Sequence, residues 1–173
     1  MTSECLVDVD SWHIDVPVAE CGEPLVDLAG SEVLQVGPDR AVRVRLAVAD
    51  RLVVAQSLLP RGVRLLVVAG HRTDGTPHGP HATGGEVDVT LCGADGTPLW
   101  LGTQVPDVGG PSRLADEVAD DGAGAHRALL GRAMTAAGMV NHPAAWWHWS
   151  YGEHLWALAT RAAARYARVA GPS

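Results

Sequence analysis

The sequence predicts an α+β fold in which a small antiparallel sheet is flanked by helices. Two strand-like runs, Val63–Ala69 and Glu86–Leu91, enclose a glycine-rich loop that contains three histidines. Two further segments, Val42–Leu58 and Ala125–Ala137, have the apolar spacing of helices. The 173 residues contain no internal repeat, low-complexity tract or convincing linker, so we expect one domain over residues 1–173.

The N-terminal part is expected to be irregular before its first helix. Residues 1–38 contain three prolines and predict a lead-in with short extended pieces. Asp39 can cap the helix that follows, and Pro60 and Gly62 end it. The apolar positions of this helix are Val42, Leu46, Ala49, Val53 and Leu58.

The middle of the chain predicts strands around a loop. Val63–Ala69 is a compact β-branched run and the best strand candidate. Gly70–Gly85 holds five Gly, two Pro and three His, so it is expected to be a loop, where sites usually lie. Glu86–Leu91 alternates as a second strand. Gly93–Gly96 then forms a turn, and Pro98–Leu101 a third strand.

The C-terminal half predicts two helices and one strand. After a polar loop over residues 102–123, Ala125–Ala137 is expected to be a helix that Gly138 closes as a left-handed cap. Ala145–Tyr151 is a tryptophan-rich strand, and the Ala/Arg-rich tail from Leu155 to Val169 is expected to be helical.

The composition favours a soluble, cytoplasmic protein. The net charge is −7 and all 13 positive charges are Arg, so no basic face indicates a nucleic acid or an anionic membrane as partner. Cys5, Cys21 and Cys92 are widely spaced and predict reduced thiols. We expect neither a signal peptide nor a membrane span. The oligomeric state stays open.

A candidate metal site surrounds the start of the second strand. In the segment HATGGEVD, the glycines let the backbone turn sharply after His81, and Glu86 and Asp88 share one face of the strand. His148, between tryptophans on another predicted strand, can supply a third ligand. Two imidazoles and one carboxylate leave an open coordination position, as in catalytic zinc sites, although the same set also suits Fe(II) or another first-row metal. Taken singly, each histidine also has the plainer interpretation of a surface or core residue.

Three segments resemble motifs of the zinc D-alanyl-D-alanine dipeptidases of the vancomycin-resistance type, within the hedgehog-like and D,D-peptidase folds. HATGGEVD resembles the element SxHxxGxAxD, which implies that His81 and Asp88 are zinc ligands. WWHWSYG resembles the later ExWH-type motif, which implies His148 as the third ligand. LLVVAGHR resembles the strand that ends in Gly-Tyr-Arg, which implies that Arg72 stabilises the oxyanion of the tetrahedral intermediate. The resemblance also implies a metal-bound water as nucleophile and a small peptide or amide as substrate.

The chain departs from these motifs in three places. The family's catalytic Glu stands three residues before the last His, where this chain has Ala145; losing that base should cost orders of magnitude in hydrolysis. Glu86 occupies a position that is usually small in the family. It could replace the lost base, become an additional metal ligand, or point to solvent. Only Thr73–Pro80 joins the arginine to the first His, in place of a long helical insertion, so we expect a more open cleft. A substitution made to trap a complex would explain Ala145 but neither of the other two departures.

Other residues are candidates for the substrate side of the site. His71 replaces the Tyr of Gly-Tyr-Arg, and His71 or His78 could be a proton shuttle or simply a loop histidine. Asp107 lies roughly where the family binds the substrate ammonium. Trp147 could line the cleft, although the tryptophans favour a role in the core.

Three functions therefore stay open on the sequence. The first is a zinc hydrolase of a small peptide or amide, with Arg72 as oxyanion partner and Glu86 as base. The second is a metalloenzyme of the same scaffold that performs a non-hydrolytic step in a specialised biosynthesis, such as a rearrangement, cyclisation or elimination. The third is a catalytically inactive metal-binding homologue.

Overall fold

The computed structural model describes residues 16–38, 41–72, 81–107 and 109–169. Within these ranges the chain forms a five-stranded sheet, a two-stranded sheet and three helices, which confirms the predicted α+β class. The larger sheet has the spatial order β2 (Gln35–Val36), β4 (Val63–Ala69), β5 (Glu86–Gly93), β7 (Ala145–Ser150) and β6 (Val140–His142). Its pairs are antiparallel except that β2 runs parallel to β4. The smaller sheet and the helices are β1 (Leu25–Asp27) paired with β3 (Arg43–Arg45), α1 (Leu46–Ser57), α2 (Asp121–Ala136) and α3 (His154–Thr160).

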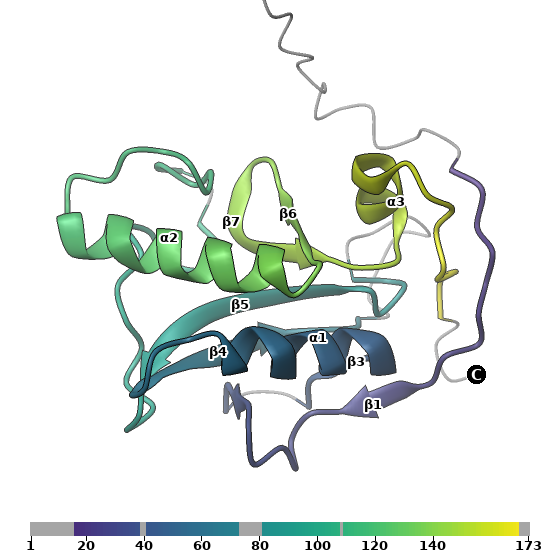
Figure 1. The fold of residues 1–173 in the computed structure, drawn as a ribbon, viewed down its shortest axis with the longest axis horizontal. Coiled ribbons are helices and arrows are strands. Elements are labelled where there is room, and N and C mark those ends of the chain that lie inside the picture. Colours follow the sequence, from purple (N-terminus) through teal and green to yellow (C-terminus); the bar gives the residue numbers. More distant parts are fainter. Residues whose placement is uncertain (1–15, 39–40, 73–80, 108, 170–173) are drawn as a thin grey trace, which may run out of the picture.

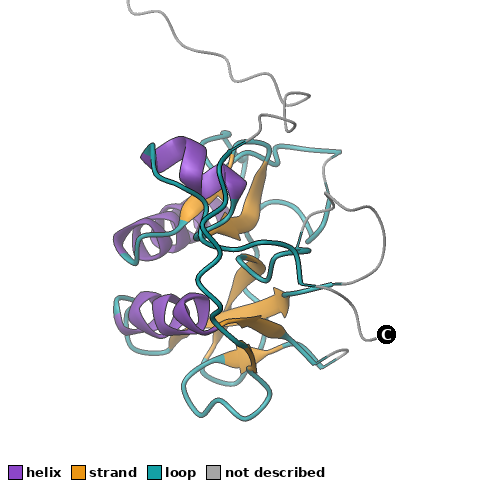
Figure 2. Ribbon diagram, turned by 90° about the vertical axis from the view of Figure 1, so that its right-hand side faces the viewer, coloured by secondary structure: helices purple, strands orange, loops and turns teal. Residues whose placement is uncertain are grey.

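The molecule has two layers. Helices α1 and α2 lie next to each other on one face of the larger sheet, and α3 lies beside β6 (Figures 1 and 2). The core between the layers takes alternate residues of β5 and one stripe of each long helix: Val87, Val89, Leu91, Val48, Leu52, Ala55, Leu130 and Met134. Because side chains alternate along a strand, Glu86 and Asp88 lie on the opposite face of β5 from Val87.

Helix α2 begins four residues earlier than predicted and ends one residue before the predicted end. Asp120 caps it by accepting hydrogen bonds from the N–H groups of Gly122 and Ala123. This cap allows a first turn that contains two glycines, which have low helix propensity. At the other end Gly138 has φ 82°, which confirms the predicted left-handed cap.

Helix α1 begins later than predicted. The sequence placed its start just after Asp39, which lies outside the described residues. The structure begins it at Leu46, because Arg43–Arg45 pairs with β1 as an antiparallel strand. The predicted strand Pro98–Leu101 is also wrong, since it is reduced to an isolated bridge between Pro98 and Cys92.

The predicted helical tail is wrong beyond its first half. Helix α3 ends at Thr160, and the residue that follows, Arg161, has a left-handed φ of 57°. The chain then runs back along the N-terminal segment, where Ala164 pairs in parallel with Val18. Val169 donates a hydrogen bond to the carbonyl of Ala82, beside the predicted metal ligand His81. The tail therefore supports the loop that carries a candidate ligand.

A buried arginine holds the loop that precedes α2. Arg127 is 1% exposed, and its guanidinium donates hydrogen bonds to the carbonyls of Leu101, Pro111 and Arg113. It also lies 5.5 Å from the centre of the Trp146 ring. These contacts hold Leu101, Pro111 and Arg113 close to the start of β7.

Arg127→Leu is expected to destabilise the fold by about 3 kcal/mol or more, because three carbonyls that Arg127 satisfies would lose their donor. Urea unfolding of the two proteins measures this difference. Arg132→Leu, on an exposed position of the same helix, is the matched control and should change the free energy of unfolding little. Equal stability of both variants would contradict the assignment.

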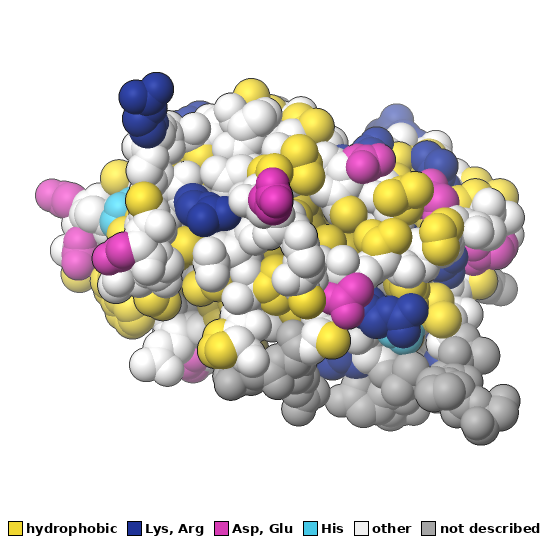
Figure 3. Space-filling model, turned by 90° about the horizontal axis from the view of Figure 1, so that it is seen from below, with side chains coloured by type: hydrophobic (Ala, Val, Ile, Leu, Met, Phe, Trp, Pro, Cys, Tyr) yellow, Lys and Arg dark blue, Asp and Glu magenta, His cyan; other side chains and the backbone are white. Residues whose placement is uncertain are grey.

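The outer surface mixes side chains of all kinds. On the face drawn in Figure 3, arginines are interspersed with Asp, Glu and hydrophobic side chains. Among the described residues, no helix is both long and apolar enough to cross a membrane.

Candidate metal centre

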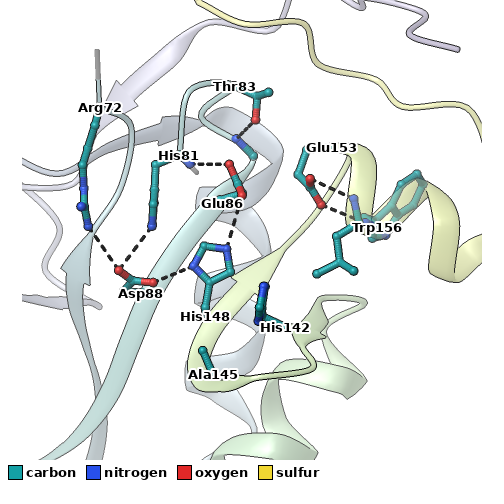
Figure 4. Close-up of polar contacts among 12 residues, drawn as sticks. Arg72, His81, Thr83, Glu86, Asp88, His142, Ala145, His148, Glu153 and Trp156 are labelled. Atoms are coloured by element: carbon teal, nitrogen blue, oxygen red, sulfur yellow. Dashed lines mark hydrogen bonds and ion pairs between the residues drawn. The ribbon is translucent and has the colours of Figure 1, made fainter. Parts of the chain in front are cut away.

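Two neighbouring strands and one turn bring the predicted ligands together. Asp88 on β5 is paired directly with His148 on β7, and His81 stands in the turn that leads into β5. Figure 4 shows the side chains of His81 and His148 converging on the Asp88 carboxylate. Antiparallel partners on one sheet face are close neighbours, so this pairing explains why residues so far apart in sequence meet.

The turn before β5 depends on its glycines. His81 has φ 68° and Gly84 φ 75°, so the backbone twice enters the left-handed region. At Gly85, a Cβ atom would lie 2.6 Å from the carbonyl oxygen of Tyr151. Gly85 also donates its N–H to the Thr83 hydroxyl at 3.0 Å. A residue larger than glycine at position 85 would therefore push the turn, and with it His81, away from β7.

The donor atoms of the three residues fit a divalent metal. One donor each from His81, Asp88 and His148 lie within 4.8 Å of one another, and all three residues are buried. His81 Nε2 lies 3.3 Å from Asp88 Oδ2, and His148 Nδ1 lies 2.8 Å from Asp88 Oδ1. Ligands about 2.0–2.1 Å from a tetrahedral zinc ion are about 3.3 Å apart, so small movements would admit the ion. Two imidazoles and a carboxylate are also donors that zinc accepts.

The charges of Asp88 and Glu86 favour a positive charge at the cluster. Burial alone would raise the pKa of Asp88, but hydrogen bonds from His148 and His81 hold it below its ordinary value. Burial disfavours the charged form of His148, yet hydrogen bonds and charges from Asp88 and Glu86 raise its pKa to about 9. In the metal-free protein, these interactions therefore favour the protonated, positively charged form of His148.

The metal-free protein is expected to lose stability as the pH rises from 6.5 to about 9, because folded His148 keeps a proton that the unfolded chain releases. This contribution is fully present below the ordinary pKa of 6.5 and lost above about 9. Zinc must displace the same proton, so its stabilising effect should grow over that window. Thermal unfolding with and without zinc across this range measures both trends. Rising stability of the metal-free protein would contradict this assignment.

Arg72 and Glu86 both reach the cluster. The Arg72 guanidinium lies 3.3 Å from Asp88 Oδ2 and its side chain is 38% exposed, so it borders the site from the solvent side. Glu86 does not point to solvent: its side chain is 13% exposed and its Oε1 lies 3.3 Å from His148 Nε2. Burial opposes the charge of Glu86, but the hydrogen bond from His148 lowers its pKa. The catalytic roles predicted for Arg72 and Glu86 stay predictions.

Ala145 lies beside a histidine that sequence reasoning missed. Ala145 opens β7 and is paired with His142 on β6, next to an irregularity in the pairing of the two strands. The His142 ring packs edge-on against His148, with ring centres 5.3 Å apart. Burial and then the charge of His148 lower the pKa of His142 to about 4. The signal that could have revealed His142 is the short spacing of Val140–His142 from β7, which is typical of a hairpin.

Glu153 is a second carboxylate that the sequence analysis did not single out. It caps α3 by accepting hydrogen bonds from the N–H groups of Leu155 and Trp156. Burial and then the charge of Glu86 raise its pKa to about 7. Its role in the described structure is to fix the start of α3 close to the site (Figure 4).

The predicted substrate-binding residues are dispersed. Trp147 is 3% exposed in the hydrophobic core, on the opposite face of β7 from His148. Asp107 is exposed and accepts a hydrogen bond from the N–H of Gly109. His71 has a buried Nε2 without a partner among the described residues, and burial followed by nearby arginine charges lowers its pKa. Their roles in substrate binding stay predictions, while His78 and the rest of Thr73–Pro80 lie outside the described residues.

Comparison with known proteins gives the same family as the motifs. The profile of the D-ala-D-ala dipeptidase family matches residues 67–169, which is more than half of the chain and includes all three candidate ligands. The D-alanyl-D-alanine dipeptidase of Synechocystis sp. (strain ATCC 27184 / PCC 6803 / Kazusa) is 32% identical over 89 residues. That match covers 45% of this chain and 36% of the Synechocystis enzyme. With its α+β fold and hedgehog-like arrangement, the chain belongs to the D-Ala-D-Ala dipeptidase family.

Proposed function

We propose that this protein is a divalent-metal enzyme, with zinc as its first candidate metal, that acts on a small peptide-like or amide substrate. The observation that carries the proposal is the buried cluster of His81, Asp88 and His148 in a chain of a dipeptidase family. When bound, a zinc ion would supply a Lewis acid that polarises a carbonyl group and acidifies water.

The side chains divide into a metal-binding set and a substrate-facing one. His81 Nε2, His148 Nδ1 and the Asp88 carboxylate would hold the metal. Arg72 contacts Asp88 through one terminal nitrogen, and the other N–H groups of its guanidinium have no hydrogen-bond partner among the described residues. These groups are suited to a substrate carboxylate or to the negative oxygen that forms when a carbonyl is attacked. Arg72 therefore serves as the substrate-side cation of the site.

A second candidate function rests on Ala145. A methyl group cannot accept the proton of an attacking water, so Ala145 cannot act as the general base that the family carries at this position. A non-hydrolytic reaction on the same scaffold, such as a rearrangement, cyclisation or elimination, would not need that base. The same donor set would then serve Fe(II) or another first-row metal as well as zinc.

The test begins with the metal content of the full chain purified without chelator. The protein is then loaded separately with zinc, cobalt and Fe(II), and assayed on D,D-dipeptides, L,L-dipeptides and simple amides. Stoichiometric metal, with turnover that disappears in Asp88→Ala, supports the first candidate. Full zinc loading with no turnover of any member would overturn the first candidate. A protein that binds none of the three metals would overturn both.

A further inference from the structure

Glu86 contacts both histidines of the candidate metal centre. Its Oε1 lies 3.3 Å from Nε2 of His148, and its Oε2 accepts a hydrogen bond from the backbone N–H of His81. Figure 4 shows the Glu86 carboxylate above the His148 ring, with Asp88 on the other side of that ring. The Glu86 side chain thus connects His148 on β7 to the turn that carries His81.

The two nitrogens of His148 have different partners. Nδ1 faces Asp88 at 2.8 Å, within the group of donors that fits a metal, whereas Nε2 faces Glu86. A neutral imidazole carries one proton, and a carboxylate at Nε2 retains that proton there. The lone pair of Nδ1 is then directed toward the metal position.

We propose that Glu86 is a positioning residue of the metal centre: it selects the His148 tautomer that presents Nδ1 to the metal and anchors the backbone of His81. This proposal rests on the proposed function only in assuming that the three residues bind a metal. Carboxylates that accept the second N–H of a ligand histidine fix its ring and raise its basicity.

The backbone of His81 gives this carboxylate a second task. With φ 68°, His81 is a non-glycine residue in the left-handed region, where a side chain strains the backbone. The hydrogen bond from its N–H to Glu86 offsets part of that strain at the residue that must present a ligand. Position 86 also lies on β5, two residues before Asp88, so Glu86 connects the strand that carries Asp88 to both histidines.

The positions of the donor atoms distinguish this positioning role from the roles of general base and additional metal ligand that the sequence suggested for Glu86. Among the described residues, the group whose donors lie within 4.8 Å of one another contains His81, Asp88 and His148 but not Glu86. Glu86 instead engages the outer nitrogen of His148. It therefore acts on the metal through its ligands.

Zinc affinity of the full chain, measured by competition with a chromophoric chelator, tests the proposal. Glu86→Ala should weaken zinc binding by about 10–100-fold. Glu86→Gln should lose less, because an amide oxygen can still accept one of the two N–H groups but not both. Glu153→Gln is the matched control, since it neutralises a buried carboxylate nearby that contacts neither histidine, and it should bind zinc within about threefold of the unchanged chain.

The histidine ring gives a readout that a purely structural role would not change. In the zinc-loaded protein, ¹⁵N–¹H spectra should show His148 protonated at Nε2 and bound through Nδ1, and Glu86→Gln should weaken the protection of that Nε2 proton from exchange with water. If Glu86→Ala does not fold, the Gln variant decides the question. An unchanged affinity together with an unchanged Nε2 proton in that variant would overturn the proposal. A loss of turnover alone, at unchanged affinity, would also overturn it and would indicate a base. If the unchanged chain binds no zinc, the proposed function fails before this inference is reached.

Discussion

Asp88→Ala is expected to weaken zinc binding at least about 100-fold, the largest loss of affinity from any single substitution in the cluster. The Asp88 carboxylate contacts both of the other candidate ligands. It lies 3.3 Å from His81 Nε2 and 2.8 Å from His148 Nδ1. Its removal takes away one ligand and also leaves two imidazoles and Arg72 without their shared anion. The pKa of His148 should fall toward its ordinary value, since Asp88 is one cause of its rise.

The measurement is again competition with a chromophoric chelator, with folding checked by circular dichroism. Asp95→Asn is the matched control. Asp95 is exposed in the turn that follows β5, and asparagine can still accept the hydrogen bond from the Thr97 N–H there. The control should keep the affinity of the unchanged chain. Zinc binding of normal strength by a folded Asp88→Ala protein would show that the metal lies elsewhere, and it would falsify the assignment of the cluster.

The sequence predicted the positions of the candidate ligands because each is tied to a local signal. The β-branched run Val63–Ala69 became β4 with the same bounds, because such residues fit a pleated, half-buried surface. Glu86–Leu91 and Ala145–Tyr151 became β5 and β7 with small changes at their ends. Once both strands were correct, the alternation of side chains placed Asp88 and His148 on faces that can meet.

The features that the sequence did not reveal depend on long-range pairing. Residues 161–169 have helix-forming composition, yet the backbone of Ala164 pairs with Val18, so a tertiary contact overrides local propensity. The contact of Glu86 with the outer nitrogen of His148 follows from the β5–β7 register, in which Glu86 is paired with Ser150. No local pattern encodes a register between strands that are about 60 residues apart. For this reason the sequence alone could not decide whether Glu86 is a base, a metal ligand or a side chain that points to solvent.

Ala145→Glu is expected to raise the rate of dipeptide hydrolysis by about 10²–10⁴-fold in the zinc-loaded protein, the usual contribution of a positioned general base. Residues three apart on a regular strand face opposite sides, but the pairing of β6 with β7 is irregular next to Ala145. Figure 4 accordingly shows the Ala145 side chain beneath His148, directed toward the site. A glutamate there would extend from the same backbone position toward the ligands.

The comparison that isolates the base is Ala145→Gln, which has nearly the same size and polarity but cannot take up a proton. Each protein is assayed on the same dipeptides at equal zinc content, and the rates are followed against pH. A gain in the Glu variant alone, with an acidic limb that the Gln variant lacks, means that the scaffold still positions substrate and metal for hydrolysis. Equal rates for both variants would instead assign any gain to packing around His142, whose ring lies against His148. If a fully loaded Ala145→Glu protein leaves every peptide intact, the site does not bind peptides in a position where they can be hydrolysed. The non-hydrolytic candidate then explains why selection could dispense with the base.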